Sequence, residues 1–334
     1  MSNNPSLLIE LPSWIGDAVM ATPTIEALID HLSPSRITLV GVASSIALFS
    51  RDTRFARCLI DSTKKSKNRF TATLTLAREI GAHDVALTFR ATAFSHILLR
   101  ATQSEMRIGK RASFLSPLFL THAINVPSTM HYVERYFRLF NKVFDASRPL
   151  GALTLQSSPI ATVRPTLAIV PGAAYGSAKR WYPQYYAEVA IALASHYDIV
   201  LLGGGAERDI ADEIAQALQN ANITLYQNLA GQTSIETLVD TLASVALFIG
   251  GDSGPMHIAA ALGRSIVAIY GPTDYRYSHP WTSTPYTLVH KNLSCMPCAK
   301  RTCPLKHHDC MRTLTPREVI DVAVRLSESP TPQS

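Results

Sequence analysis

Short apolar runs alternate with segments of helical periodicity along the whole chain. This alternation predicts parallel β-sheets that are covered by helices on both faces. The predicted strands occupy residues 7–11, 37–42, 85–89, 167–170, 199–202, 245–249 and 266–270.

The predicted strands fall into two series. Residues 145–165 separate them, and this segment is rich in Ser, Pro and Thr with little periodicity, which is typical of an interdomain connection. A chain of 334 residues also suits two domains better than one. We therefore expect a Rossmann-like N-terminal domain at residues 1–150 and a Rossmann-like C-terminal domain at 151–315. A last helix and tail at 316–334, opened by Thr315 and Pro316, is expected to pack back toward the N-terminal domain.

Composition narrows the class of partner. The formal net charge is +6, and 47% of the residues are hydrophobic, so the chain is folded and suits an anionic partner. No apolar run approaches the ~20 residues that cross a bilayer, and residues 1–10 lack the basic start of a secretory signal. These features predict a cytoplasmic protein with peripheral membrane contact at most.

Polar, glycine-bearing motifs directly follow four of the predicted strands. In open parallel sheets, ligands bind beyond the carboxyl ends of the strands, so all four motifs are expected to face one cleft. The motifs are SWIGD at 13–17, GAAYGSAKR at 172–180, GGGAER at 203–208 and GGDSGPMH at 250–257.

The motif at 250–257 suits a phosphate or a ribose. Its glycines allow close approach of the backbone, and Pro255 at the start of a predicted helix, residues 255–262, leaves N–H groups pointing outward. The alternative is that Asp252 or Ser253 simply caps this helix. For His257, one turn into the helix, the alternative is a histidine of the core.

Lys179 is the candidate for stabilising a leaving group. A diphosphate gains negative charge as its bond breaks, and a lysine on a small-residue loop can neutralise that charge in the transition state. Arg180 is either a second clamp or a surface cation. Trp181 and Tyr182 are expected to pack rather than to bind.

Two carboxylates complete the candidate chemistry. Glu207 is placed to accept hydrogen bonds from ribose hydroxyls, or it only stabilises the first turn of a helix. Asp17, on a strand-to-helix turn, is placed to deprotonate an attacking hydroxyl, or it is an N-cap. Neither glycine cluster has the dinucleotide spacing G-x-G-x-x-G, and no P-loop is present, which disfavours a dehydrogenase or a P-loop ATPase.

Five motifs together carry a resemblance that spans nearly the whole chain: SWIGDAVMATP, MHYVERYFRLF, PGAAYGSAKRW, GDSGPMHIAAALG and CMPCAKRTCPLKHHDCM. They resemble the ADP-heptose:lipopolysaccharide heptosyltransferases, glycosyltransferase family 9. The cysteine–histidine motif and YGSAKRW are most similar to the branch that adds the second inner-core heptose. One departure is Tyr182, an additional residue between Trp181 and Pro183, which bears on the path of the loop.

The resemblance implies an α/β GT-B fold, in which two doubly wound domains face a central cleft. It also implies an inverting transfer by one direct displacement, with no required cofactor. By the same resemblance, Asp17 is the general base, Lys179 contacts the ADP diphosphate and Glu207 meets the ribose. The residues implied around the sugar diphosphate are Asp252, Ser253, Gly254 and His257. The other predicted substrate-binding residues are Gly16, Ala173, Ala174, Arg180, Thr233 and Met256.

Two regions remain open. Arg90, Arg107 and the basic run at 64–69 are candidates for binding acceptor carboxylates or phosphates through charge-assisted hydrogen bonds. Four cysteines have the spacing C-x2-C-x4-C-x6-C, with His307 and His308 among them, which suits a structural zinc ion, reduced thiols or a disulfide. These cysteines are Cys295, Cys298, Cys303 and Cys310.

The leading hypothesis is a monomeric transferase at the cytoplasmic face of the inner membrane, with no nucleic-acid partner. It would move heptose from ADP-L-glycero-D-manno-heptose to heptosyl-Kdo2-lipid A. The alternatives are a family member that adds the first or third heptose, another ADP-sugar transferase, a GT-B-like sugar-nucleotide epimerase and a non-catalytic nucleotide-sugar-binding protein.

Overall fold

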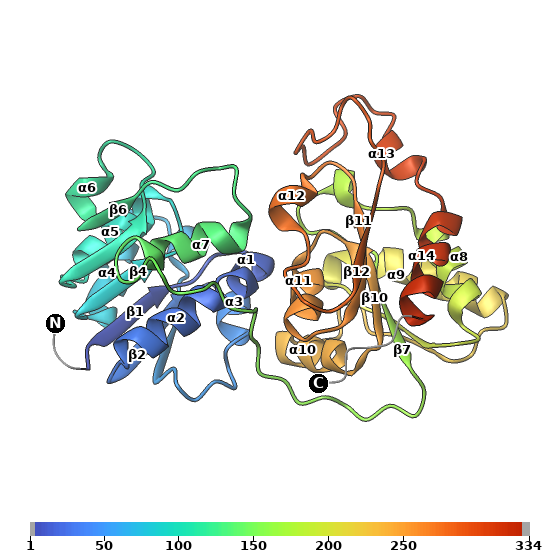
Figure 1. The fold of residues 1–334 in the computed structure, drawn as a ribbon, viewed down its shortest axis with the longest axis horizontal. Coiled ribbons are helices and arrows are strands. Elements are labelled where there is room, and N and C mark those ends of the chain that lie inside the picture. The colour runs from blue at the N-terminus through green and yellow to red at the C-terminus, as the bar shows by residue number, and fades with distance from the viewer. Residues whose placement is uncertain (1–3, 329–334) are drawn as a thin grey trace. The chain divides into compact units, whose positions relative to one another are not determined.

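The computed structural model describes residues 4–328, which form two compact units that divide between Gln156 and Ser157 (Figure 1). This division lies slightly beyond the expected boundary at residue 150. Each unit contains a six-stranded, parallel sheet with helices. Among the described residues, no helix combines the length and apolar character needed to cross a membrane.

The N-terminal unit has the strand order β3-β2-β1-β4-β5-β6. Its strands are β1 (Ser6–Glu10), β2 (Arg36–Gly41), β3 (Arg57–Ile60), β4 (Val85–Thr88), β5 (Met106–Lys110) and β6 (His122–Ile124). Its helices are α1 (Ile15–Met20), α2 (Thr22–Leu32), α3 (Ala43–Ala47), α4 (Arg69–Ile80), α5 (Ala93–Ala101), α6 (Ser116–Phe119) and α7 (Tyr132–Asn141), with a 3-10 turn η1 at Thr63–Lys65. Because β1 and β4 are buried on both faces, they appear in the sequence as continuous apolar runs.

Two helical layers cover this sheet. α4 and α5 pack on one face, where Leu76 and Leu98 join Leu8 and Ala86 of the strands in one core cluster. α1, α2 and α7 contact one another and form the other layer. From β1 the chain adds strands first on one side and then on the other. Because each crossover is right-handed, the helices of the two halves lie on opposite faces of the sheet.

The C-terminal unit has the strand order β12-β11-β10-β7-β8-β9. Its strands are β7 (Thr166–Val170), β8 (Asp198–Leu201), β9 (Tyr226–Asn228), β10 (Leu247–Gly251), β11 (Ser265–Tyr270) and β12 (Tyr286–His290). Its helices are α8 (Pro183–Leu193), α9 (Arg208–Asn220), α10 (Ile235–Ser244), α11 (Gly254–Ala261), α12 (Tyr275–Ser278), α13 (Asp309–Arg312) and α14 (Pro316–Glu328), with 3-10 turns η2 at Ser177–Lys179 and η3 at Gly205–Glu207.

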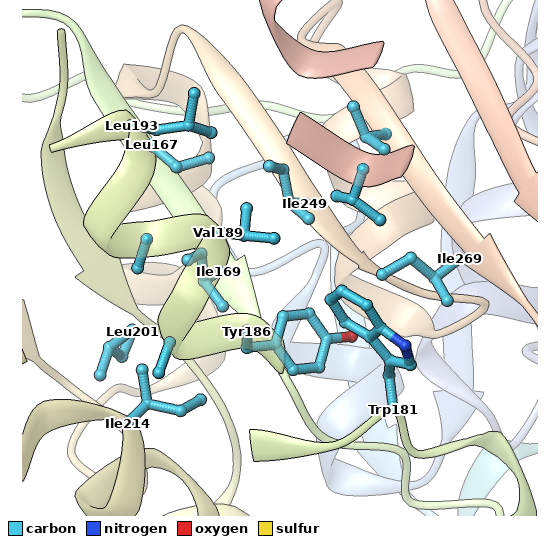
Figure 2. Packing of buried hydrophobic residues seen from close by; sticks show 14 of the residues in the cluster. Leu167, Ile169, Trp181, Tyr186, Val189, Leu193, Leu201, Ile214, Ile249 and Ile269 are labelled. Carbon is cyan, nitrogen blue, oxygen red and sulfur yellow. The ribbon is translucent and has the colours of Figure 1, made fainter. Parts of the chain in front are cut away.

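Aliphatic side chains and the aromatic rings of Trp181 and Tyr186 fill the core between α8 and this sheet (Figure 2). Trp181 and Tyr186 are fully buried, and their rings meet edge to face with centroids 4.9 Å apart. The Trp181 indole N–H donates to the backbone oxygen of Leu314 at 3.0 Å, and the Tyr182 ring packs against Tyr185. The prediction that Trp181 and Tyr182 pack is confirmed.

All seven predicted strands are present. Five further strands were not predicted from the sequence pattern: β3, β5, β6, β9 and β12. Four of these five are the edge strands of the two sheets, and β5 lies next to an edge. An edge strand is covered on fewer sides, so its residues are more polar and form no apolar run.

The last helix begins at Pro316, as predicted, and the Glu318 carboxylate accepts hydrogen bonds from the N–H and the hydroxyl of Thr315. α14 packs against α8, β11 and β12, and Val319 and Ala323 belong to the core of the C-terminal unit. The segment predicted as separate is therefore part of this unit, because the apolar face of its helix is buried there. Its expected contact with the N-terminal domain stays a prediction, and residues 329–334 of the predicted tail lie outside the described residues.

Candidate active site

Three motifs of the C-terminal unit meet at one edge of its sheet. β10, β7 and β8 are neighbours in the sheet and run parallel, so the loops that follow them lie side by side. The Lys179 ammonium pairs with Asp252 at 2.6 Å, and the Arg180 guanidinium lies 3.8 Å from Glu207. The sequence prediction that these loops share one edge is confirmed, whereas SWIGD belongs to the other unit and its place in a common cleft stays a prediction.

The loop that carries Lys179 is held by a segment more than a hundred residues away. The Ala178 N–H donates to the backbone oxygen of Arg301 at 3.0 Å, and the Tyr175 hydroxyl donates to that of Ala299 at 2.9 Å. A Cβ atom on Gly176 would stand 2.4 Å from the Arg301 oxygen, so this contact requires glycine. The segment around Arg301 therefore decides where Lys179 lies.

Lys179 is a shielded cation with two favourable contacts. Its side chain is 11% exposed, pairs with Asp252 and lies 5.4 Å from the centre of the Tyr175 ring. Burial alone would favour the neutral carboxyl of Asp252, but Lys179 and His257 together hold the pKa of Asp252 below its usual value. An anionic ligand would have to share Lys179 with Asp252.

Three buried polar atoms at this edge have no hydrogen-bond partner among the described residues: Ser253 Oγ, His257 Nδ1 and Arg180 Nε. Ser253 is the N-cap residue of α11, but its side chain makes no capping bond. Burial lowers the pKa of His257 to about 4, so the ring is neutral at neutral pH. Buried polar atoms without partners are costly, and a bound ligand is one way to satisfy them.

Glu207 contacts both its own turn and the neighbouring cation Arg180. Its Oε2 accepts the Gly204 N–H at 2.8 Å, which caps the turn η3, while its Oε1 faces Arg180. A Cβ on Gly172 would stand 2.0 Å from Glu207 Cγ, so the glycine makes room for the carboxylate. The predicted contact with a ribose stays a prediction.

The remaining predicted substrate-binding residues of this unit differ in exposure. Ala173 is buried and Ala174 is exposed, both on the loop after β7, and Gly254 begins α11. Met256 is fully buried, and its sulfur receives the Tyr270 hydroxyl at 3.7 Å, so only its backbone is left for a ligand. Thr233 lies further out, in the loop that follows the edge strand β9.

In the N-terminal unit, Asp17 lies in the first turn of α1, directly after β1, and is partly exposed. The Tyr136 hydroxyl of α7 donates to Asp17 Oδ1 at 2.9 Å, and the adjacent Gly16 is buried. Burial and the negative charge of Asp17 raise the pKa of Tyr136 well above 10, so the phenol keeps its proton. The N-cap residue of α1 is Trp14, which leaves Asp17 outside the capping role.

Tyr136 is a residue of the site that the sequence did not identify. It stands in the motif MHYVERYFRLF, which carried part of the family resemblance, but nothing local to it marks one tyrosine above the other. The T-shaped contact of its ring with Phe89, at 5.3 Å between centroids, orients it toward Asp17. Only the packing of α7 on α1 reveals this partner.

Arg90, predicted to bind the acceptor, lies in a buried network. Its NH1 donates to Asp61 at 2.7 Å and lies 3.2 Å from Glu10. Burial raises the pKa of Glu10, a shift that Arg90, Thr88 and Ser95 oppose. An acceptor anion would have to compete with two carboxylates, although the buried NH2 of Arg90 has no partner in the described structure.

Arg107, the other acceptor candidate, lies near the amino end of β5. Its guanidinium donates to the backbone oxygens of Phe119 and Ser104. Because ligands in parallel sheets bind at the carboxyl ends, this position argues against contact with a substrate at the edge of Asp17. Strand β5 was not among the strands predicted from the sequence, so the position of Arg107 near its amino end could not be foreseen.

The four clustered cysteines line one small pocket without forming a disulfide. Burial, reinforced by the neighbouring thiols, raises the pKa of Cys310 to about 11. Within residues 4–328, no group of three or more His, Cys, Asp or Glu side chains is arranged to hold a metal ion. The predicted structural zinc ion at these cysteines therefore stays a prediction.

The architecture and the site together define a class. The two parallel, Rossmann-like sheets with helices match GT-B heptosyltransferase structures. The structure of E. coli ADP-heptose lps heptosyltransferase II superposes with a TM-score of 0.81 at 25% identity, over 96% of this chain and 98% of that chain. An E. coli heptosyltransferase, WaaC, with ADP-2-deoxy-2-fluoro heptose shares the fold, with a TM-score of 0.76 at 18% identity over 96% and 99% of the two chains.

The family follows from the sequence comparison. The model of glycosyltransferase family 9 (heptosyltransferase) matches residues 73–308. Lipooligosaccharide heptosyltransferase 2 of Campylobacter jejuni subsp. jejuni serotype O:6 is 34% identical over 322 residues, which is 96% of this chain and 99% of the relative. This chain belongs to glycosyltransferase family 9.

Proposed function

We propose that this enzyme transfers heptose from ADP-L-glycero-D-manno-heptose to the inner core of lipopolysaccharide, with heptosyl-Kdo2-lipid A as acceptor. The observation that carries the proposal is the cluster at the ends of β10, β7 and β8, where Lys179 is held beside unpartnered polar atoms of Ser253 and Arg180. The similarity to heptosyltransferase 2 of C. jejuni over nearly the whole chain supports the choice of acceptor.

The donor half of the reaction is assigned to the C-terminal unit. Lys179 contacts the diphosphate and stabilises the charge that develops on it, and Arg180 is the second cation. Ser253 and the N–H groups at the start of α11 donate to the phosphates. The Glu207 carboxylate accepts hydrogen bonds from the ribose hydroxyls. Asp252 holds the Lys179 ammonium in place before the donor binds.

The acceptor half is assigned to the N-terminal unit. Asp17 takes the proton of the attacking hydroxyl as a bond forms between that oxygen and the anomeric carbon. The bond from the anomeric carbon to the β-phosphate oxygen breaks, and its electron pair leaves with ADP. One displacement inverts the anomeric centre, so a single carboxylate suffices. Tyr136 holds this carboxylate in place through its hydrogen bond.

The setting of the reaction is part of the same proposal. The enzyme acts as a monomer at the cytoplasmic face of the inner membrane, because its acceptor is anchored there by acyl chains. A formal net charge of +6 favours approach to anionic lipid.

The test is incubation of the full chain with ADP-heptose and two acceptors, Kdo2-lipid A and its mono-heptosylated form, followed by mass spectrometry. We expect the mass of one heptose to be added to the pre-heptosylated acceptor alone. Addition to Kdo2-lipid A would assign the first heptose instead. Conversion of ADP-heptose without any acceptor would contradict a transferase and favour epimerase chemistry.

A further inference from the structure

Three large apolar side chains stand in solvent at one end of the N-terminal unit. Phe114 is 84% exposed, Leu118 68% and Leu115 45%, all on the loop after β5 and on the short helix α6 (Figure 1). Single exposed apolar residues are ordinary, but three within five positions are the mark of a contact surface. We name residues 110–118 the apolar tip.

The apolar tip is a built structure rather than a loose loop. The buried hydroxyl of Ser116 accepts the N–H groups of Ala112 and Ser113 at 3.0 and 3.1 Å. Leu120, directly after α6, is buried in the core cluster beneath α5. The backbone is thus tied down at both ends, and the side chains of Phe114 and Leu118 are held outward.

Cations and a further exposed aromatic ring continue the surface on the neighbouring helices. α6 contacts α5, and α5 contacts α4. At the start of α4, the Arg69 guanidinium lies 3.9 Å from the centre of the Phe94 ring of α5, which joins the two helix starts. Phe70 beside it is 53% exposed, and Lys64, Lys65 and Lys67 are exposed on the preceding turn.

This side of the unit has very few carboxylates. Residues 62–78 contain no Asp or Glu, and Glu105 is the one acidic residue within 85–133. The same two stretches contain lysines and arginines throughout, including Lys110 and Arg111 on the apolar tip itself. Lys110 and Arg111 thus bring positive charge to the apolar tip, with no acidic residue in that segment.

The surface also has a definite place relative to the chemistry. The apolar tip follows the carboxyl end of β5, and α4 and α5 begin at the same edge of the sheet. Asp17 follows the carboxyl end of β1 at this edge. A surface that contacts a membrane here would bring the general base toward a lipid-anchored hydroxyl.

We propose that the apolar tip and the basic run at 64–69 dock on an anionic phospholipid bilayer. Phe114, Leu115 and Leu118 enter the boundary between headgroups and acyl chains, while the surrounding cations meet the phosphates. The inference extends the proposed function, because a lipid-anchored acceptor lies in such a membrane, but the docking itself requires no acceptor.

Flotation of the full chain with vesicles that contain no acceptor tests the docking. Vesicles of phosphatidylglycerol and phosphatidylethanolamine are expected to bind the protein, and phosphatidylcholine vesicles to bind it far more weakly. The double variant Phe114→Ser, Leu118→Ser should bind at least about 10-fold more weakly. Neutralising Lys64, Lys65 and Lys67 to Ser should weaken binding by about 5-fold per cation, and added salt should mimic this loss.

Two controls make the result specific. Val163→Ser removes a fully exposed apolar side chain from the other unit and should leave vesicle binding unchanged. Phe114→Trp places a fluorophore on the apolar tip, whose emission brominated phospholipid should quench. Equal vesicle binding by the wild type and the Phe114, Leu118 variant would overturn the proposal. The proposal would also be overturned if sedimentation showed that this variant changes from dimer to monomer while its vesicle binding is unchanged.

An activity arm separates this inference from the proposed function. The Phe114, Leu118 variant should retain wild-type turnover on a deacylated, water-soluble acceptor but lose rate on acceptor embedded in vesicles. If no form of the enzyme transfers heptose to the deacylated acceptor, the proposed function fails while the vesicle-binding result still decides the docking.

Discussion

The two units hold their polar groups in different ways. In the C-terminal unit, the charged groups come from the loops that follow three neighbouring strands. Each cation lies beside one carboxylate: Lys179 pairs with Asp252, and Arg180 lies near Glu207. In the N-terminal unit, the carboxylate of Asp17 accepts a hydrogen bond from the neutral phenol of Tyr136, which comes from a helix far away in the sequence. The polar groups of the C-terminal unit are thus held in pairs of opposite charge, whereas the carboxylate of Asp17 accepts a hydrogen bond from a neutral group.

Replacing the general base should have the largest effect. Asp17→Asn should lower kcat by about 10²- to 10⁴-fold, because no other group takes the proton from the attacking hydroxyl. The Kd for ADP, measured by calorimetry, should stay at the wild-type value, since the donor groups lie in the other unit. A variant with near-normal turnover would remove Asp17 from the mechanism.

Removal of the donor cation should come next. Lys179→Ala should lower kcat/KM by about 100-fold, because the leaving diphosphate loses a charge-assisted contact. Unlike the Asp17 variant, it should also weaken ADP-heptose binding. Lys179→Arg serves as the charge-matched control, and loss of turnover with unchanged donor affinity would contradict this division of roles.

The neutral, buried His257 should make the free energy of unfolding depend on pH. Its folded pKa of about 4 lies below the unfolded value of about 6.5, so the unfolded chain binds more protons between these values. The contribution of the neutral His257 ring to the free energy of unfolding is complete above pH 6.5. It falls by about 3 kcal/mol in total as the pH falls toward 4.

Urea unfolding of the wild type and of His257→Gln at pH 7.5 and pH 4.5 measures this contribution. Glutamine is neutral at both values, so the pH-dependent loss should be smaller in the variant. An identical loss in both proteins would show that His257 takes no part in the pH dependence.

The smallest effect is expected at Tyr136. Tyr136→Phe removes one hydrogen bond to Asp17 and should cost about 3- to 10-fold in kcat. Because the phenol favours the charged carboxylate, the acidic limb of the rate–pH profile should move to higher pH. A loss that is equal at every pH, with an unmoved limb, would assign Tyr136 a purely structural role.

The sequence pattern located the central strands of both sheets correctly. β1, β4, β7 and β10 appear as apolar runs because they are buried on both faces, and the loops after them are marked by glycine. The polar edge strands β3, β6, β9 and β12 carry no such signal. Arg107 shows a further limit, since β5 was not predicted from the sequence and the position of Arg107 near its amino end was therefore not foreseen.

By itself, the sequence determined the class of fold and the family, because hydrophobic period and glycine-bearing motifs are local properties. Tertiary structure alone decided which groups pair: Tyr136 with Asp17, Arg301 with the loop of Lys179, and Arg90 with Glu10 and Asp61. These contacts join residues far apart in the chain, and their energy depends on distances that only the packing of helices on a sheet sets.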